Sequence, residues 1–312
     1  MKILAKIFTV LVFILMLSGT AAATSNSTSH KNLAAKPSST VNLIFIHHST
    51  GENWLNDDNG GLGNALRKNN YHVSDTNYGW GPDSIGDRTD IGNWWEWFRG
   101  SRSSTYLSAL YKEKGQHCSY SRLASGPSGE NQIIMFKSCF PNSALKGRPN
   151  DPVPSISKNS LRGQSADSDA HTVANAKGIY IDILKYFQTR QDKLFIVITA
   201  PPLSDGTYAH NARAFNQWLV NDWLKNYHYH NVFVFDFYNV LTTNGGNSNT
   251  NDLGRASGNH HRWWNNAIQH KISNHNTLAY PSGDDHPSRA GNLKATAEFV
   301  PLLNYAYRIW KT

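Results

Sequence analysis

The stretch VNLIFIHHSTGENWL (residues 41–55) decides the fold, because a short core strand stops there at small polar residues. Residues 41–46 form an apolar run of β-branched and large side chains, which is typical of a buried strand in a parallel sheet. The sequence HHSTG follows directly. Ligands of open α/β sheets bind at the carboxyl ends of the strands, so Ser49 is expected where a nucleophile is useful. The alternative is that Ser49 and Thr50 only cap the next helix.

Four further apolar segments have the character of strands, and helical patterns alternate with them. We expect these strands at residues 71–78, 132–137, 193–200 and 231–238, and helices at residues 62–68, 105–112, 173–188, 211–226 and 291–310. This alternation predicts a three-layer α/β/α sandwich around a mainly parallel five-stranded sheet. The sequence has no internal repeat and no domain boundary after residue 40, so residues 41–312 are expected to form one domain.

The N-terminus predicts export. Basic residues flank an apolar run at residues 7–17, and small residues follow as far as residue 23, which is the pattern of a secretory signal peptide. The run is short for a membrane span, so we expect cleavage after residues 1–23, a secreted or extracytoplasmic protein and no stable membrane span. An uncleaved N-terminal anchor is the alternative. Residues 24–40, rich in Ser, Thr, Ala, Asn and Lys, predict a flexible linker.

The charge and the aromatic content of the chain indicate which classes of binding partner to expect. The formal net charge is +8, but the basic residues are scattered and no nucleic-acid motif is present, so a nucleic-acid partner is not expected. The charge favours an acidic partner or simply solubility. Trp (10) and Tyr (14) are abundant, as in proteins that stack sugars, although most rings are expected in the core. The aromatic run at residues 94–98 is either the hydrophobic face of a helix or lid that packs on the core, or part of an aromatic wall of a substrate site.

The cysteine and histidine residues leave two questions open. An even pair, Cys118 and Cys139, suggests one disulfide in an exported protein, and two separate buried thiols are the alternative. His47 and His48 could be metal ligands, but adjacent residues of a strand point to opposite sides. No ligand set at a typical metal spacing completes them. We therefore expect no metal and no cofactor, with one imidazole lining the pocket and the other packed.

Polar residues suited to acyl transfer follow three strands and precede the last helix. Ser49 follows the first strand, Gly79 (or Gly81) the second and Asn142 the third, and residues 284–286 read Asp-Asp-His. Acyl transfer needs a nucleophile, a base and donors for the oxyanion. Ser and His supply the first two, and a backbone N–H or an Asn amide supplies the donors. A carboxylate near the His would orient the imidazolium.

The order of these blocks resembles that of the SGNH (GDSL-like) hydrolase superfamily. Members of that superfamily carry a Ser block, a Gly block, an Asn block and a DxxHP-type block in this order along the chain. Here HHSTG matches the Ser block at Ser49, NYGWG resembles the Gly block at Gly79 and KSCFPNS matches the Asn block at Asn142. The last block, DDHPSRAGN, matches at His286. The resemblance covers roughly residues 41–312 and implies the flavodoxin-like α/β/α fold of that superfamily.

The chain departs from the family pattern at three places. Two histidines replace the usual Gly-Asp before the Ser, FPNS replaces Gly-x-Asn-Asp, and Gly283 stands three positions before His286 where the family has Asp. The acid is therefore displaced: Asp284 is the first choice and Asp285 the second. A Ser-His dyad that uses a backbone carbonyl is a further alternative. These changes imply a divergent member of the superfamily.

The resemblance implies a secreted serine esterase. Ser49 attacks an ester carbonyl, His286 is general base and then acid, and Asp284 orients His286. The oxyanion is held by the N–H groups of Ser49 and Gly79 and by the side chain of Asn142.

Aromatic richness and export favour an acylated extracellular carbohydrate as the substrate, with His48 and Trp80 as substrate-binding residues. The alternatives are a non-catalytic glycan-binding or cell-surface protein on the same fold, and a glycan-cleaving lyase or glycosidase. The sequence does not determine the oligomeric state.

Overall fold

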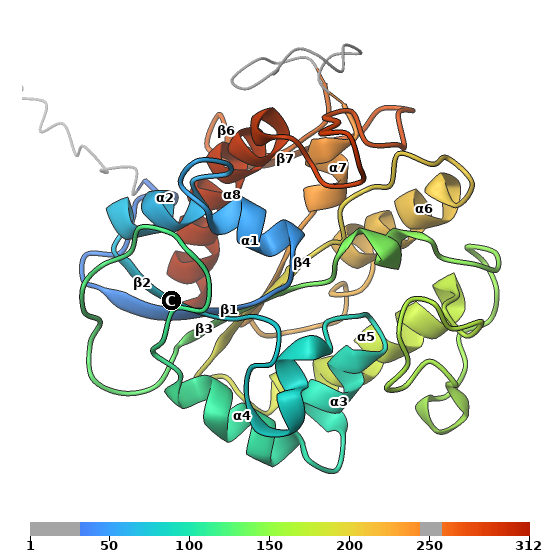
Figure 1. The fold of residues 1–312 in the computed structure, drawn as a ribbon, viewed down its shortest axis with the longest axis horizontal. Coiled ribbons are helices and arrows are strands. Elements are labelled where there is room, and N and C mark those ends of the chain that lie inside the picture. The colour runs from blue at the N-terminus through green and yellow to red at the C-terminus, as the bar shows by residue number, and fades with distance from the viewer. Residues whose placement is uncertain (1–31, 244–257) are drawn as a thin grey trace, which may run out of the picture. The chain divides into compact units, whose positions relative to one another are not determined.

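Five parallel strands form the central sheet, in the order β2-β1-β3-β4-β5 (Figure 1). This computed structural model describes residues 32–243 and 258–312 of the chain. The strands are almost entirely buried, as their apolar sequences require. They are β1 (Val41–Ile46), β2 (Tyr71–Thr76), β3 (Ile133–Lys137), β4 (Leu194–Ile198) and β5 (Val232–Phe235). The predicted α/β/α fold with a parallel five-stranded sheet is therefore confirmed.

Two hydrophobic clusters, one on each face of the sheet, fill the space between strands and helices. Successive side chains of β1 alternate between them, because Ile44 and Ile46 join the first cluster whereas Leu43 and Phe45 join the second. The first cluster includes side chains of α3 (Asn93–Arg99), α4 (Ser103–Lys112), α5 (Val173–Gln188) and α6 (Ala209–Asn221). The second includes side chains of α1 (Thr50–Leu55), α2 (Leu62–Lys68), α7 (Phe237–Leu241) and α8 (Arg289–Trp310). These clusters make the three layers (Figure 1).

Several elements differ from the sequence prediction. The strands expected to reach residues 78 and 200 end at Thr76 and Ile198, and the helix expected to reach residue 226 ends at Asn221. The fifth strand, expected to reach residue 238, ends at Phe235 because Asp236 caps α7: its carboxylate accepts a hydrogen bond from the Asn239 N–H at 3.0 Å. An antiparallel hairpin of β6 (His260–Trp264) and β7 (Ala267–Lys271) was not predicted. Three short 3-10 helices complete the described elements, namely η1 (Pro82–Asp87), η2 (Phe140–Ser143) and η3 (Ile156–Lys158).

The predicted N-terminal segments are only partly covered. The predicted signal peptide, residues 1–23, lies outside the described residues, and the predicted linker is described from residue 32. There the chain is attached to the domain: Asn304 Nδ2 donates to the Ala34 carbonyl at 3.1 Å, and Asn70 Nδ2 donates to the Pro37 carbonyl at 2.7 Å. The described part of the predicted linker is thus hydrogen-bonded to the domain at these two points. Within the described ranges, no helix is both long and apolar enough to cross a bilayer.

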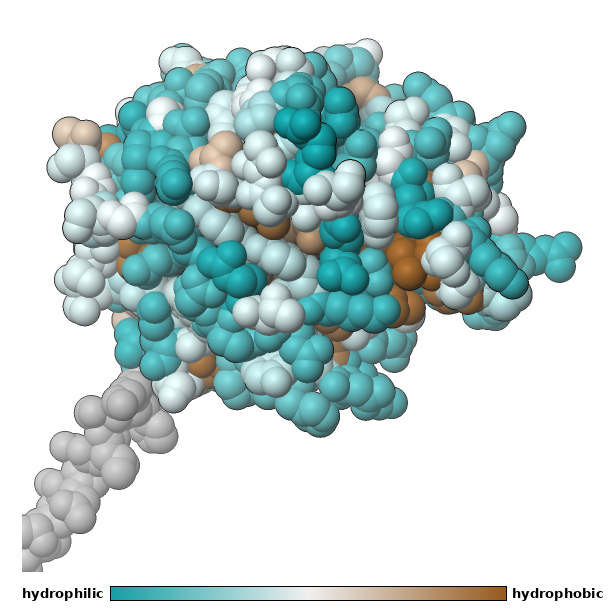
Figure 2. All heavy atoms as spheres, turned by 90° about the horizontal axis from the view of Figure 1, so that it is seen from below, coloured by the Kyte–Doolittle hydropathy of each residue, from teal (hydrophilic) through white to brown (hydrophobic). Residues whose placement is uncertain are grey.

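The aromatic run of α3 belongs to the core. Trp94, Trp97 and Phe98 are buried and join the first hydrophobic cluster. Core packing, one of the two interpretations of residues 94–98, is confirmed for these three rings. The face of the molecule on the α3 and α4 side is correspondingly hydrophilic, with hydrophobic side chains in small, separate areas (Figure 2).

Candidate active site

Ser49 stands at the point where the order of the sheet reverses. The chain leaves β1 for its neighbour β2 on one side and later enters β3 on the other side. In doubly wound folds the crevice at the carboxyl ends of such strands binds ligands. Ser49 has φ 34° and ψ −89°, in the positive-φ region that side chains other than Gly rarely adopt. The turn thus holds the Ser49 backbone in a strained conformation, which is often found at functional sites.

The tight turn also explains Gly51. A Cβ atom at residue 51 would collide with the Cβ atom of His47, because the first turn of α1 folds back closely on the end of β1. Only Gly allows this approach. The HHSTG sequence is therefore a structural unit in which Gly51 permits the turn that presents Ser49.

The structure brings Ser49, His286 and Asp284 into one hydrogen-bonded chain. The Ser49 hydroxyl pairs with His286 Nε2, and His286 Nδ1 lies 3.0 Å from Asp284 Oδ2. When Nδ1 carries the imidazole proton toward Asp284, Nε2 is free to accept the proton of Ser49. The ring of Phe140 stands edge-on to His286, with ring centroids 5.0 Å apart. The imidazole is thus oriented from two sides.

The loop before α8 holds the acid. Asp284 Oδ1 accepts a hydrogen bond from the His286 N–H at 2.8 Å. This backbone contact, followed by those from the His286 and Ser282 side chains, lowers the pKa of Asp284. Asp285 points elsewhere, because its Oδ1 accepts from the Ser204 N–H at 2.8 Å. Of the two candidate acids, Asp284 is the one in contact with His286.

Gly79 has the open surroundings that a ligand-binding glycine needs, but its N–H is engaged. Its φ is +71°, and a Cβ atom placed there would meet nothing within 4 Å. The N–H donates to Asp87 Oδ1 at 2.7 Å. The alternative, Gly81, is more crowded, since its Cβ would lie 3.1 Å from Ile85 Cγ2.

Asn142, the second expected oxyanion donor, is also engaged. Its side-chain amide donates to Asp90 Oδ1 at 2.6 Å, and its Oδ1 accepts from the Ile91 N–H at 2.8 Å. Asn142 is 1% exposed. The Asn142 side chain therefore fastens the segment before α3 to η2. Two of the three expected donors, those of Gly79 and Asn142, thus contact a carboxylate in this arrangement.

The two predicted substrate-binding side chains, His48 and Trp80, are buried. His48 bonds through Nε2 to the Gly86 carbonyl and through Nδ1 to the Thr89 hydroxyl at 3.1 Å. Burial lowers the pKa of His48. The Trp80 indole N–H donates to Glu113 Oε2 at 2.7 Å, and Trp80 joins the first hydrophobic cluster. These positions do not favour direct contact of either side chain with a substrate.

Tyr78 is the exposed aromatic ring of this region, and sequence reasoning missed it. It is 63% exposed and stacks on His48 with ring centroids 3.9 Å apart. Its place in the NYGWG sequence, directly before Gly79, is the signal that could have drawn attention to it.

A buried lysine beneath the nucleophile turn was also missed. Lys137 ends β3 with no exposed surface, and its ammonium donates to the Thr50 hydroxyl and to the Ser138 carbonyl at 3.1 Å. The structure shows no carboxylate paired with it in the described ranges. Burial lowers the pKa of Lys137 to about 8. The sequence signal is a charged residue at the end of the otherwise apolar strand QIIMFK.

The suggested disulfide is wrong for this structure, in which both cysteines are free and half-buried. Cys118 Sγ lies 3.9 Å from His47 Nε2, whereas Cys139 Sγ lies 3.6 Å from the Thr50 hydroxyl. The Cys118 sulfur thus lies near His47, directly after β1, whereas the Cys139 sulfur contacts Thr50, the first residue of α1. Burial, and then the neighbouring Asp75 carboxylate, raises the pKa of Cys118, which argues against a thiolate nucleophile.

Comparison with known proteins adds no assignment, because no family model and no curated protein matches the sequence. Function has to be argued from the site itself. The arrangement offers a serine hydroxyl, a histidine base and a carboxylate in hydrogen-bonded order.

Proposed function

We propose that this protein is a serine ester hydrolase and a divergent relative of the SGNH superfamily. The observation that carries the proposal is the hydrogen-bonded chain from Ser49 through His286 to Asp284. Three further features support it: the strained backbone of Ser49, its place at the sheet's reversal point and the edge-on contact of Phe140 with the imidazole.

In this mechanism, His286 Nε2 takes the hydroxyl proton as Ser49 Oγ bonds to the ester carbonyl carbon. Asp284 accepts the Nδ1 hydrogen bond and stabilises the imidazolium. The tetrahedral intermediate then expels the alcohol, which receives the proton from His286, and an acyl-enzyme remains. Water, deprotonated by His286, attacks the acyl carbonyl and releases the acid, and the proton returns to Ser49.

The oxyanion of the intermediate would be held by the N–H groups of Ser49 and Gly79 and by the Asn142 amide. This assignment requires the Gly79 N–H and the Asn142 amide to exchange their present partners, Asp87 and Asp90, for the oxyanion. The exchange is favourable only when the substrate oxygen gains negative charge, because a neutral carbonyl is a weaker acceptor than a carboxylate.

The substrate class we propose is an acylated extracellular carbohydrate, such as an acetylated polysaccharide. The exposed Tyr78 ring next to Gly79 supports it, since an aromatic face of this kind can stack on a sugar. Export, proposed from residues 1–23, would bring the enzyme to such a polymer.

The test is hydrolysis of p-nitrophenyl acetate and butyrate by the wild type, Ser49→Ala and His286→Ala. We expect each variant to lose at least about 10³-fold in kcat/KM. A fluorophosphonate probe should label the wild type at Ser49 and leave Ser49→Ala unlabelled. The control variants are Ser104→Ala and His228→Ala, two exposed positions outside the proposed site, which should retain wild-type rates. Equal rates in wild type and Ser49→Ala, with no label on Ser49, would rule the proposal out.

A non-catalytic glycan-binding protein is the second candidate, favoured by one observation. Two of the three expected oxyanion donors, the Gly79 N–H and the Asn142 amide, contact carboxylates, which an inactive descendant of the fold could retain permanently. Incubation with an acetylated polysaccharide separates the candidates. Free acetate indicates the esterase, binding without acetate release indicates the binding protein, and shortened chains in mass analysis indicate a lyase or glycosidase.

A further inference from the structure

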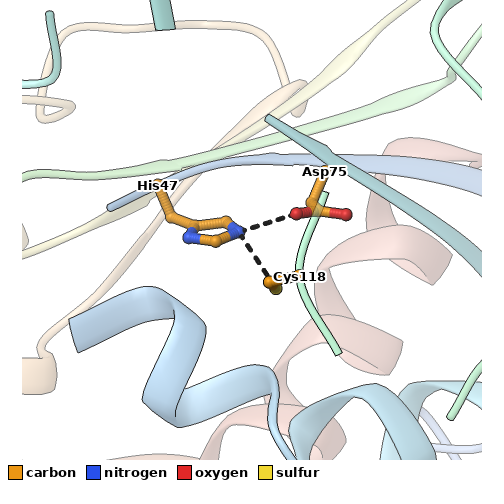
Figure 3. Close-up of side chains that lie close together, drawn as sticks. All are labelled: His47, Asp75 and Cys118. Atoms are coloured by element: carbon orange, nitrogen blue, oxygen red, sulfur yellow. Dashed lines mark hydrogen bonds and ion pairs between the residues drawn. The ribbon is translucent and has the colours of Figure 1, made fainter. Parts of the chain in front are cut away.

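The side chains of His47, Asp75 and Cys118 converge on one point beside the end of β1 (Figure 3). His47 Nε2 lies 3.1 Å from Asp75 Oδ2 and 3.9 Å from Cys118 Sγ. The three potential ligand atoms all lie within 4.8 Å of one another. None of these residues belongs to the Ser49 chain described above.

The geometry is not that of a cysteine nucleophile with its base. In such a relay the thiol and the carboxylate occupy opposite nitrogens of the imidazole, so that a proton can pass from one side while the other side orients the ring. Here Asp75 and Cys118 both face Nε2 of His47 (Figure 3). Three potential ligand atoms that face one point are typical of a binding site and not of a proton relay.

The fold builds this convergence from two neighbouring strands and a loop. Phe45 pairs with Asp75 in the register of β1 and β2, and His47 projects on the same side as Phe45, with ring centroids 4.8 Å apart. His47 lies two residues beyond Phe45, and its imidazole reaches the Asp75 carboxylate diagonally. Cys118 arrives from the irregular segment between α4 and β3.

The same loop segment orients the carboxylate. Asp75 Oδ1 accepts hydrogen bonds from the His117 N–H and the Tyr120 hydroxyl, both at 2.8 Å. These donors flank Cys118 in the sequence, so the segment that delivers the sulfur also turns Asp75 Oδ2 toward His47. Such outer contacts, which orient a ligating carboxylate, are typical of metal sites.

We infer that His47, Asp75 and Cys118 form a binding site for a zinc-like divalent transition-metal ion. Imidazole nitrogen, carboxylate oxygen and thiolate sulfur are the donors that Zn²⁺ takes in proteins. Tetrahedral coordination with bonds of about 2.0–2.3 Å places donor atoms about 3.3–3.6 Å apart. The separations of 3.1 Å and 3.9 Å from His47 bracket that spacing, and the Asp75 and Cys118 donor atoms lie within 4.8 Å of each other. Side-chain movements of about 1 Å therefore bring all three donors to this spacing.

Three protein donors leave a fourth coordination position for water. His47 and Asp75 are fully buried, whereas Cys118 is half-buried, so the ion enters from the Cys118 side. The Cys118 thiol proton leaves to solvent, and His47 binds through Nε2 with its own proton moved to Nδ1, an atom that has no hydrogen-bond partner among the described residues. The ion would fasten the segment carrying Cys118 to the ends of β1 and β2. This role is independent of the proposed ester hydrolysis.

The test uses the full chain, freed of metal with a chelator and kept reduced. Zn²⁺ is titrated in competition with a chromophoric chelator, and Co²⁺ is added separately because a thiolate ligand gives a charge-transfer band. The decisive comparison is Cys118→Ala against Cys139→Ala, the matched control at the other cysteine. We expect one tight Zn²⁺ site and the Co²⁺–thiolate band in the wild type, in Cys139→Ala and in Ser49→Ala. Cys118→Ala should lose the band and bind Zn²⁺ at least about 100-fold more weakly.

Thermal unfolding provides a second readout that does not depend on the band. Zn²⁺ should raise the Tm of the wild type and of Cys139→Ala, but not that of Cys118→Ala, because a ligand bound only by the folded state stabilises it by mass action. Three outcomes would overturn the inference: no stoichiometric Zn²⁺ binding by the wild type, an unchanged Co²⁺ band in Cys118→Ala, or loss of the band in Cys139→Ala instead.

Discussion

Two histidine–aspartate pairs flank the end of β1, and they differ in exposure and in geometry. The pair His47–Asp75 has fully buried side chains, whereas the side chains of His286 and Asp284 are 23% and 65% exposed. Asp284 contacts Nδ1 of its histidine and leaves Nε2 to Ser49. Asp75 shares Nε2 of its histidine with Cys118.

The difference teaches that the same residue types serve different chemistry according to which ring nitrogen they occupy. Partners on opposite nitrogens make a proton path that solvent and substrate can reach. Partners on a single nitrogen make a fixed, buried convergence, suited to holding structure or an ion. Each of the following predictions tests one side of this comparison.

The largest expected effect on stability comes from Asp75→Ala. The change leaves the buried imidazole of His47, the His117 N–H and the Tyr120 hydroxyl without their shared acceptor. We expect the free energy of unfolding to fall by about 3 kcal/mol in urea denaturation with a chelator present. Asp284→Ala, in the exposed pair, should lower the free energy of unfolding much less. Equal losses in the two variants would show that exposure does not separate the pairs.

The acid dependence of stability provides a check on the same residue. Burial by itself would raise the pKa of Asp75, but the hydrogen bond from His47 and further contacts lower it overall. A carboxylate with a lowered pKa in the folded state contributes stability above the ordinary pKa of Asp, and this contribution is lost as the pH falls through the lowered value. The wild type should therefore lose more stability than Asp75→Ala on acidification, and parallel curves would contradict this account.

The next prediction concerns the exposed pair. Asp284→Asn should reduce kcat for p-nitrophenyl acetate on the order of 100-fold or more, because an amide can favour the imidazole tautomer that cannot accept the Ser49 proton. Asp285→Asn is the matched control, since its side-chain oxygen can still accept from the Ser204 N–H. Its effect on kcat should be much smaller. A larger loss in Asp285→Asn would reverse the assignment of the acid.

The smallest expected effect concerns Lys137. Its ammonium is buried and, within the described residues, has no carboxylate partner, whereas His47 and His286 each have one. The folded-state pKa of Lys137, about 8, lies below the ordinary value for Lys, so between these values the unfolded chain binds a proton that the folded protein has released. Stability linked to Lys137 therefore increases with pH in this window. Relative to Lys137→Met, the wild type should gain about 1–2 kcal/mol in unfolding free energy between about pH 8 and pH 9.5.

The control for this measurement is Lys68→Met, an exposed lysine at the end of α2. Its unfolding free energy should follow the wild type across the same pH range. If Lys137→Met also follows the wild type, burial does not lower the pKa of Lys137 in the folded protein.

The fold was predictable because its signals are local. The apolar run of β1 and the helical periodicity of α5 depend on neighbouring residues alone, and both elements have the predicted bounds. The change from β5 to α7 was missed because the apolar pattern continues through Asp236, whose side chain caps the helix.

The sequence alone selected the candidate residues of the proposed site, through the order of the polar blocks along the chain. These residues are Ser49, Gly79, Asn142, His286 and one of two aspartates. Only the tertiary structure decided that Asp284 contacts the imidazole, that carboxylates engage Gly79 and Asn142, and that Trp80 is buried.

The His47–Asp75–Cys118 cluster could not be predicted from the sequence, because its members come from three segments without a local spacing pattern. The sequence thus determined the five strands of the central sheet, most of the helices and the residues available at the strand ends. Contacts between those ends depend on strand register and on how the loops pack, which are properties of the whole folded chain, and only the tertiary structure decided them.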